Sequence, residues 1–427
     1  MKNMQTSKKH LPFASVWRRV LLFISVFGPA TITAMADNDA SGVATYSIAG
    51  ARLGYPILLP LLIITVLLGV TQEMGMRLTV ITRKGLADLI RERWGVKTAF
   101  LMFACLLVAN MGTIVTDIAA VKTTSQIFNL PGIPVALLIM GISILFVIKG
   151  DYKLTEKIML VSSLFFFTYL ISAFAAKPDW GLALGNLFYP HGVAFTPAYL
   201  KDFLFIGMGV LGTTVTPWGQ FFISSFAYDK KIEPGKVNFS QLETYWGAFL
   251  TDFFSFFMIV ATAATLFVHG IPLVSGEQAA LAIEPFAGNL AGVLFAIGIL
   301  NAGFMGLVIV SLATAYAFAE FFGISGSLND SFSRSKTFYF IYIGQLLVAF
   351  VIILFPGVSL FKLAIATQVV NAIALPLIFF YLIRLTNDKK LMGEFANNTF
   401  QKVFAIACTL LIVAAATFTV VTVVFRL

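Results

Sequence analysis

The stretch Ala36-Asp37-Asn38-Asp39-Ala40-Ser41-Gly42 interrupts an apolar run that extends from Val20 to Gly50. Carboxylates are costly at the depth of a lipid bilayer, and where they occur they usually mark the path of an ion or a substrate. The stretch is also rich in small and polar residues. We therefore expect a membrane helix that is broken at residues 36–42 and carries a binding site at the break.

The composition of the chain excludes a soluble domain. Hydrophobic residues make up 59% of the sequence, charged residues make up 11%, and the mean hydropathy is +0.91. These values are typical of a polytopic membrane protein. A net charge of +9 could suggest nucleic acid as a partner, but the basic residues lie in short loops between apolar segments. We expect a lipid bilayer as the partner, with no nucleic acid and no obligate protein partner.

A membrane-spanning helix needs about 20 apolar residues, and this requirement predicts an all-α chain with eleven spans. The predicted spans are 17–52, 55–79, 99–123, 131–149, 155–176, 202–228, 240–268, 286–323, 336–355, 358–385 and 401–425. No soluble domain is visible in 1–427. We expect a single transport domain with a cytoplasmic segment 1–16, one repeat over 17–176, a second over 202–385 and an extra helix at 401–425.

The distribution of basic residues predicts the orientation. With the N-terminus in the cytoplasm, the inner segments hold all but six of the 29 Lys and Arg. Such a bias is typical of cytoplasmic loops, and with eleven spans it places the C-terminus outside. The six exceptions are Arg52, Lys122, Lys177, Lys201, Lys362 and Arg426.

The first segment could instead be a secretory signal, because Ala34-Met35-Ala36 resembles a cleavage site after an apolar run. We favour a membrane helix, since Gly28-Pro29 interrupts that run. Cleavage would also discard the segment that leads into the acidic stretch. Cys105 and Cys408 lie within predicted spans, and we interpret them as small core residues rather than as a disulfide.

The sixth span contains a second interruption, Gly212-Thr213-Thr214-Val215-Thr216-Pro217-Trp218-Gly219. Pro217 removes a backbone donor, and the glycines should loosen the helix. Broken helices at corresponding places in two halves indicate a transporter site at the interface of an inverted repeat. Sequence identity between the halves is not detectable, so this prediction depends on the pattern alone.

The two breaks predict a cation site whose ligands are all oxygen atoms. The C-terminal end of a half-helix favours a cation, and here it offers the carbonyl of Ala36. Asp39 would add a carboxylate, and the second break would add the carbonyl of Thr213 and the hydroxyl of Thr216. Oxygen ligands suit Mg²⁺, Ca²⁺ or Mn²⁺. The metal would be the transported substrate, and we expect no cofactor.

Further residues are candidates for the ion, its water shell or its pathway, and each has a structural alternative. Asp39 could cap the second half-helix, and Asp37 could hold water or end a helix. Thr216 could return its hydroxyl to a preceding carbonyl. We expect Asn38 to satisfy freed backbone groups rather than to bind metal.

The remaining candidates lie on other spans. Gln72 and Gln368 could form hydrogen bonds between helices or contact the ion. We include Gln368 among the candidate metal ligands. Asp117, Asp252 and Glu73 could line a pathway, or they could pair with Arg77 or with backbone donors. The phenylalanine-rich tracts are predicted to face lipid or to pack in the core.

Four groups of residues, spread over nearly the whole chain, form recognisable motifs: Gly28-Pro29-Ala30 with Val43-Ala44-Thr45 and Gly54-Tyr55; Gln72 with Arg77-Leu78 and Thr82; Thr116-Asp117-Ile118-Ala119; and Gln368-Val369-Val370 with Leu375-Pro376. Together they resemble the Nramp metal-ion transporters. The resemblance implies a LeuT-type fold of five plus five helices with one extra helix, in which helices 1 and 6 are broken. It also implies transport of divalent metals with protons.

The departures from the family pattern concern the site itself. The family's Asp-Pro-Gly-Asn motif falls on Asp39-Ala40-Ser41-Gly42, so the metal-binding Asn is replaced by Gly42. The family's Met-Pro-His falls on Thr216-Pro217-Trp218, and the Glu expected three residues after Asp117 is Ala120. Loss of the thioether removes discrimination against hard cations. A roomier pocket suits Mg²⁺, which keeps several of its waters.

This pattern resembles the prokaryotic Nramp-related magnesium transporters. It implies a protein of the prokaryotic plasma membrane that moves partly hydrated Mg²⁺ or Mn²⁺ by alternating access with weak or no proton coupling. A proton-coupled importer of Mn²⁺ or Fe²⁺ is one alternative, and a LeuT-type carrier of an organic solute is another. We expect no enzymatic activity, because no nucleophile with a base and no metal-hydrolase spacing occurs.

Overall fold

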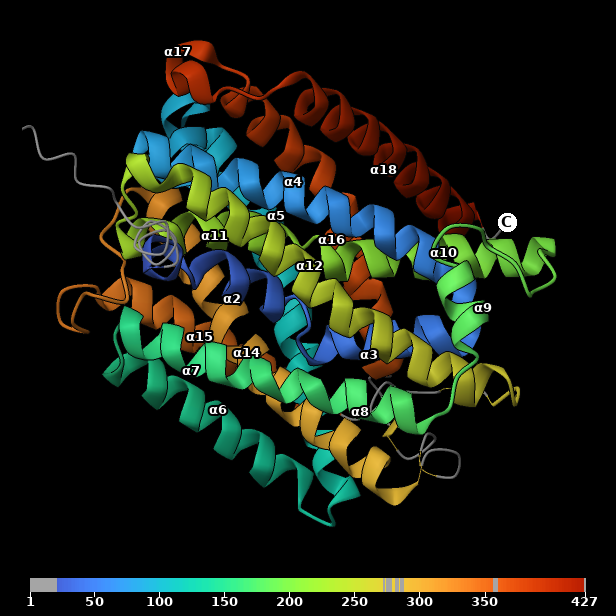
Figure 1. Ribbon diagram of the computed structural model, residues 1–427. Coiled ribbons are helices and arrows are strands. Elements are labelled where there is room, and N and C mark those ends of the chain that lie inside the picture. Colours follow the sequence, from blue (N-terminus) through green and yellow to red (C-terminus); the bar gives the residue numbers. More distant parts are fainter. Residues whose placement is uncertain are drawn as a thin grey trace, which may run out of the picture.

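The computed structural model describes residues 21–271, 273, 279–280, 284, 288–355 and 360–425, and within this part the chain is α-helical without β-strands (Figure 1). Ten helical segments of the described part are long and apolar enough to cross a membrane. They are formed by α4 (Leu58–Thr82), α5 (Leu86–Ile127), α6 (Gly132–Lys149), α7 with α8 (Tyr152–Ser163, Phe167–Ala175), α10 with α11 (Pro197–Thr214, Pro217–Lys230), α12 (Val237–Thr262), α14 (Asn289–Phe322), α15 (Lys336–Leu354), α16 (Leu360–Thr386) and α18 (Thr399–Phe425).

The helices α2 (Pro29–Ala36) and α3 (Ala40–Leu53) supply the eleventh span. Each is too short to cross a membrane alone, but Figure 1 shows that they follow one another along the direction of α4 and α12. Both helices lie in the interior, packed against α12. By contrast, α18 lies at the periphery of the bundle, which fits its largely exposed apolar surface. The broken helix therefore runs through the middle of the protein.

The first break comprises Asp37–Asp39 and is narrower than the predicted interruption at 36–42. The helix α2 ends at Ala36, and Asp37 to Asp39 form a tight turn whose N–H groups bond to the carbonyls of Ala34, Met35 and Ala36. Asp39 then caps α3 by accepting a hydrogen bond from the Gly42 N–H. Asp is a favoured N-cap because its side chain satisfies a donor that has no partner within the helix.

The second break comprises Val215–Thr216, between α10 and α11. In a continuous helix the Thr213 carbonyl would accept from residue 217, but Pro217 has no N–H to donate. Thr216 caps α11 by accepting a hydrogen bond from the Gly219 N–H at 3.1 Å. The prediction that Gly212 loosens the helix is wrong. Gly212 is helical, and a Cβ there would clash with the Gln368 carbonyl of α16, so this glycine permits close helix packing.

Other predictions of boundaries need correction. The third span was predicted to begin at 99, but α5 begins at Leu86 and has a kink at Gly95, so Arg91 and Arg93 lie on a helix rather than in a loop. The connection 178–201 contains the short helix α9 (Trp180–Gly185).

The supposed cleavage site is buried within α2. The basic start of that segment lies outside the described residues. Cys105 and Cys408 are free rather than joined in a disulfide, as predicted, but both are only partly buried.

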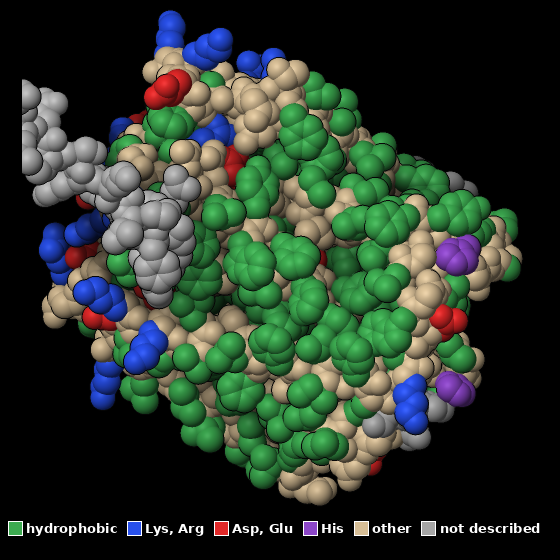
Figure 2. Space-filling view, in the orientation of Figure 1, with side chains coloured by type: hydrophobic (Ala, Val, Ile, Leu, Met, Phe, Trp, Pro, Cys, Tyr) green, Lys and Arg blue, Asp and Glu red, His purple; other side chains and the backbone are tan. Residues whose placement is uncertain are grey.

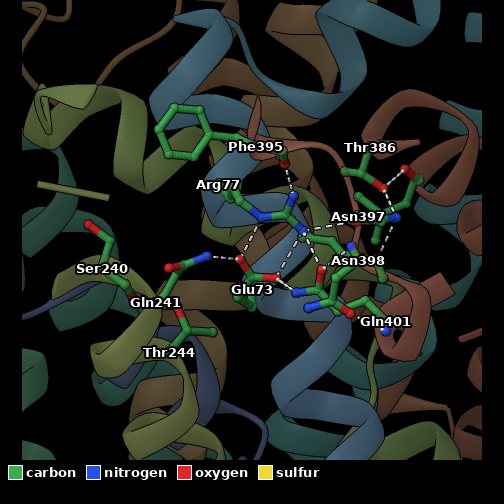
Figure 3. A network of polar contacts seen from close by, with 12 residues as sticks. Glu73, Arg77, Ser240, Gln241, Thr244, Thr386, Phe395, Asn397, Asn398 and Gln401 are labelled. Carbon is green, nitrogen blue, oxygen red and sulfur yellow. Dashed lines mark hydrogen bonds and ion pairs between the residues drawn. The ribbon is translucent and has the colours of Figure 1, made fainter. Parts of the chain in front are cut away.

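A buried ion pair joins four parts of the bundle (Figure 3). Arg77 and Glu73 lie on α4, and the Arg77 Nε donates to Glu73 Oε1 at 2.6 Å. The two Glu73 oxygens also accept from Gln241 of α12 and Gln401 of α18, each at 2.7 Å. Arg77 donates to Asn397 at 2.8 Å, in the segment before α18. Both charges are thus fully compensated, which is the condition for burying an ion pair without a large penalty.

Candidate cation site

The two breaks meet at the carboxylate of Asp37. The hydroxyl of Thr216 donates to Asp37 Oδ1 at 2.8 Å, and the amide of Gln72 lies 3.4 Å from Asp37 Oδ2. All three side chains are buried. The structure therefore brings together three of the predicted residues from the first break, the second break and α4. The alternative for Thr216, a bond to a preceding carbonyl of its own helix, is wrong.

Asp39 uses one carboxylate oxygen to cap α3. Its Oδ1 accepts from the Gly42 N–H at 2.7 Å and from the Ser41 hydroxyl at 2.8 Å. Among the described residues, no hydrogen bond is formed to Asp39 Oδ2. Capping therefore occupies one oxygen and leaves the other for a ligand, so the two roles considered for Asp39 are compatible.

Three oxygen atoms converge on Gly42. A Cβ at this position would lie 2.6 Å from the Asp37 carbonyl oxygen, 2.9 Å from the Thr213 hydroxyl and 3.3 Å from Asp39 Oδ1. The Thr213 hydroxyl is buried, and no described residue forms a hydrogen bond with it. A side chain at residue 42 would occupy the region between these oxygens. Glycine keeps the oxygens accessible to a cation or to its water.

The backbone carbonyls at the breaks also lack their usual donors. In a continuous helix the Asp37 carbonyl would accept from the Ser41 N–H, but that N–H donates to Asp117 Oδ1 at 3.0 Å. The Thr213 carbonyl has no donor at the next turn of the helix, because Pro217 lacks an N–H. The Ala36 carbonyl differs, because it accepts the Asp39 N–H at 3.0 Å. Of the two carbonyls predicted as ligands, that of Ala36 already accepts a hydrogen bond. The Thr213 carbonyl is therefore the better candidate for binding a cation.

Helices α5 and α16 support the first break through Ser41. The Gln368 amide donates to the Ser41 hydroxyl at 2.6 Å, and Asn371 donates to Gln368 Oε1 at 2.7 Å. Gln368 thus reaches the carboxylate of Asp39 through Ser41, and its direct contact with an ion stays a prediction. Asp117 is held by a backbone donor rather than by Arg77, and its buried Oδ2 has no hydrogen-bond partner in the part of the chain that the structure describes.

Asn38 anchors the first break to α12. Its amide donates to the carbonyl and the hydroxyl of Thr251, both at 3.0 Å, and its Oδ1 accepts from Ser255 at 2.9 Å. Asn38 thus bonds to a backbone carbonyl in the interior of α12 rather than to one freed at the break, and the expectation that it does not bind metal stays a prediction. Asp252 lies between these two α12 residues in sequence and is buried, and no salt bridge to it is formed among the described residues.

The site region carries an excess of negative charge. Asp37, Asp39, Asp117 and Asp252 are all buried, and within the described residues none of them forms a salt bridge. A buried carboxylate without a counter-charge is strongly unfavourable, so this region favours cations or protons. In the same part of the chain, no three His, Cys, Asp or Glu side chains gather as a metal cluster. A cation here would depend on carbonyl, hydroxyl and carboxylate oxygens together.

Glu243 is a residue that the sequence analysis did not identify. This α12 side chain is buried, and its Oε1 accepts from the N–H groups of Gly28, Ala30 and Thr31 at 2.8, 3.1 and 3.0 Å. It therefore caps the start of α2, whose other end carries Asp37, and the positive end of the helix dipole stabilises the carboxylate. An acid within a predicted span was the available signal.

Ser41 and Asn371 were also missed as partners of the site. Ser41 was noted only as a small polar residue of the acidic stretch, and its bonds to Asp39 and Gln368 depend on a neighbouring helix. Asn371 follows Gln368 by three residues, a spacing that places both side chains on one face of a helix. That spacing could have indicated a polar pair.

Comparison with known proteins gives consistent matches. Residues 30–422 match the family model described as natural resistance-associated macrophage protein-like, or Nramp. The divalent metal cation transporter MntH of Ralstonia nicotianae is 28% identical over 403 residues, which cover 91% of this chain and 88% of the relative. A protein with the same description from Agrobacterium fabrum is 26% identical and covers 97% and 90% of the two chains.

Solved structures agree on the fold. The Eremococcus coleocola manganese transporter, in complex with an aromatic bis-isothiourea substituted compound, has a TM-score of 0.76 at 19% identity and covers 98% of this chain and 90% of that chain. The nucleobase-cation-symport-1 family transporter Mhp1 has a TM-score of 0.53 at 16% identity, with 93% of each chain covered. The expected LeuT-type fold and the expectation of a transporter rather than an enzyme are confirmed. The chain belongs to the Nramp family.

Proposed function

We propose that this protein transports divalent metal cations across a membrane, with Mg²⁺ and Mn²⁺ as its substrates. The observation that carries the proposal is the convergence of the Asp37 carbonyl, the Thr213 hydroxyl and Asp39 Oδ1 beside Gly42. Curated relatives over nine-tenths of the chain are named divalent metal cation transporters, which supports the same class of substrate.

The donor set favours hard cations. Carboxylate, carbonyl and hydroxyl oxygens suit Mg²⁺ and Mn²⁺, whereas a thioether would favour softer metals. Thr216 stands where the family pattern has Met, and its hydroxyl holds Asp37 instead of offering sulfur. Gly42 stands where the pattern has Asn and adds no side-chain ligand. We infer that the ion keeps part of its water shell, because the protein offers few direct ligands and Mg²⁺ dehydrates reluctantly.

We further propose weak or no coupling to protons. Trp218 and Ala120 stand where the family pattern has His and Glu, and neither side chain titrates. Among the described histidines, His191 lies beyond α9, and His269 lies in the turn after the π-helical segment Ala263–Phe267 that follows α12, both away from the breaks. Alternating access would occur as the helices that carry the breaks rock against the remaining helices.

The proposed location is the plasma membrane of a prokaryote, with the N-terminus in the cytoplasm and the C-terminus outside. Figure 2 supports this orientation, because Lys and Arg side chains gather at the end of the molecule where α7 begins and α17 (Lys389–Met392) lies. The opposite end shows few basic side chains in this view. Such an asymmetry is typical of a cytoplasmic face.

Ion uptake into liposomes tests the proposal. The purified protein is reconstituted with a Mg²⁺ indicator and a pH dye inside, and Mg²⁺ or Mn²⁺ is added outside. We expect Mg²⁺ and Mn²⁺ entry without acidification of the lumen. Mn²⁺ entry that strictly requires proton entry, with no Mg²⁺ flux, would instead support a proton-coupled importer. An absence of divalent flux together with calorimetric binding of an organic solute would overturn the metal proposal.

A further inference from the structure

A groove of about 1000 Å³ lies between α16 and α18, near the start of α5. It lies at the end of the bundle where α17 connects the two helices (Figure 1). The groove is remote from the breaks, because its lining residues come from the C-terminal half of α16, the first half of α18 and the kink region of α5. It therefore needs an explanation separate from the cation site.

The mouth of the groove is cationic. Arg93, Arg384, Lys390 and Lys402 line it, and Asp388 is the acid among its lining residues. Arg93 and Asp388 form an ion pair at 2.6 Å, and the hydrogen bond from Arg93 lowers the pKa of Asp388, which therefore stays ionised. This pair compensates itself and leaves three basic side chains that carry a net positive charge.

The neighbouring acid Glu92 does not cancel this charge. Glu92 lies beside Arg93 on α5, but its carboxylate is paired with Lys84 at 2.6 Å. Arg384 lies over the ring of Phe380 at 5.5 Å, which holds its guanidinium at the edge of the groove. Figure 2 shows Lys and Arg side chains over the α17 end, next to a broad band of hydrophobic side chains.

Below the mouth, the walls of the groove are apolar. Phe380 and Ile383 of α16 form one wall, and Ile406, Leu410 and Val413 of α18 form the other. Pro376 also lines the groove. It lies in the interior of α16, at a position where a proline favours a kink in the helix. The side chains of Phe380 and Leu410 are 47% and 65% exposed, so the groove is open along its side.

We propose that this groove is a binding site for one anionic phospholipid, with its phosphate group at Arg384, Lys390 and Lys402 and an acyl chain against α16 and α18. Basic pockets between membrane helices on the cytoplasmic side are suited to anionic headgroups. The net positive charge at the mouth selects against a zwitterionic lipid. The apolar walls distinguish a lipid from soluble phosphate, because only a lipid carries a chain that can cover them.

Trp94 gives the site a probe. It lines the groove beside Arg93, and its ring packs edge-on against Tyr381 of α16 at a centroid distance of 4.8 Å. Aromatic side chains of this kind are common at the level of lipid headgroups. A lipid brominated on its acyl chain and bound in the groove should therefore quench Trp94 fluorescence.

Native mass spectrometry of the full-length protein tests the proposal directly. Detergent-purified protein is titrated with phosphatidylglycerol, with phosphatidylcholine and with glycerol phosphate. We expect retention of one phosphatidylglycerol and little of the other two compounds. The double variant Arg384→Gln/Lys402→Gln should bind phosphatidylglycerol roughly 30-fold more weakly, since each basic residue near an anionic lipid contributes about a fivefold change in affinity.

Two controls separate the site from general charge and from misfolding. Lys153→Gln/Lys157→Gln removes two exposed basic residues from α7 at the same end of the bundle and should leave binding unchanged. Val413→Trp fills the groove without changing a charge and should also weaken lipid binding. In the wild type, brominated phosphatidylglycerol should quench tryptophan fluorescence more strongly than brominated phosphatidylcholine does. This difference between the two lipids should disappear in Trp94→Phe.

The outcomes that would overturn the proposal are distinct. Equal retention of phosphatidylglycerol and phosphatidylcholine would show that charge does not select the lipid. Binding of glycerol phosphate as tight as that of the lipid would show a soluble-anion site. Unchanged binding in the Arg384→Gln/Lys402→Gln variant, with the α7 control equally unchanged, would place any retained lipid elsewhere on the protein.

Discussion

Two polar regions are buried within the bundle, and they differ in how their charges are compensated. In the Glu73–Arg77 network, both charges are paired and both Glu73 oxygens accept bonds from amides of other helices. At the breaks, Asp37, Asp39 and Asp117 form no salt bridge with any described residue, and the Thr213 hydroxyl and Asp117 Oδ2 have no partner.

This difference distinguishes a region that stabilises the fold from a region that can bind a ligand. A compensated buried ion pair stabilises one arrangement of helices, and it offers nothing for a further ligand to bind. An uncompensated acidic region is unfavourable alone and becomes favourable when a cation or proton arrives. The comparison predicts that substitutions in the network affect folding, whereas substitutions at the breaks affect ion binding and transport.

The largest effect is expected for Asp39→Ala, which should abolish Mg²⁺ flux in liposomes while the fold stays intact, at a cost of about 1 kcal/mol in stability because the N-cap of α3 is lost. Asp39→Asn separates the two roles of this residue, because Asn remains a good N-cap but lacks the charge. We expect Asp39→Asn to fold like the wild type and to transport poorly. Flux at the wild-type level in either variant would remove Asp39 from the ion site.

The next effect concerns the network. Glu73→Gln leaves the buried Arg77 without its counter-charge, and breaking such a pair typically costs about 3–5 kcal/mol of stability. We expect a lower midpoint of thermal unfolding in detergent, with Mg²⁺ affinity of the folded protein unchanged. The double variant Glu73→Gln/Arg77→Met removes both charges and should recover part of the loss. Weakened Mg²⁺ binding with unchanged stability would contradict the division between the two regions.

A smaller effect is expected for Gly42→Ala. The added methyl would lie 2.6 Å from the Asp37 carbonyl, so an oxygen that we assign to the ion must move. We expect roughly tenfold weaker Mg²⁺ binding by calorimetry, corresponding to about 1.4 kcal/mol. Gly209→Ala in α10 is the matched control, because its Cβ would meet neighbours only at 3.5 and 3.7 Å. Equal affinities in both variants would show that the ion does not lie beside Gly42.

The smallest effect is a change of selectivity in Thr216→Met. A thioether favours Mn²⁺ over Mg²⁺, so the ratio of Mn²⁺ to Mg²⁺ uptake should rise by several-fold. Thr216→Val removes the hydroxyl without adding sulfur and should lower both fluxes without the same change in ratio. An unchanged ratio in Thr216→Met would mean that this side chain does not face the ion.

Much of the fold could be predicted from the sequence because membrane helices are governed by simple requirements of length and hydrophobicity. The positions of both breaks also followed from local chemistry, through Asp39 as a cap and Pro217 as a missing donor. The widths of the breaks could not be predicted in this way, because a glycine such as Gly212 can either loosen a helix or allow close packing. The choice depends on the neighbouring helix α16, which local sequence does not reveal.

The candidate site was predicted in its parts but not in its connections. Asp37, Thr216 and Gln72 were all identified, yet their meeting at one carboxylate depends on how three helices pack. Glu243 was missed for the same reason, since its partners at the start of α2 lie more than 200 residues away in sequence. Long-range hydrogen bonds of this kind have no local signal.

Anomalous diffraction from crystals soaked in Mn²⁺ tests the central claim most directly. We predict one strong peak between the two breaks, beside Gly42, with Asp39 as a direct ligand or as a partner through one water. The same soak of Asp39→Ala crystals should show no peak. A peak at another position, or one that persists unchanged in Asp39→Ala, would contradict the assignment of this region as the cation site.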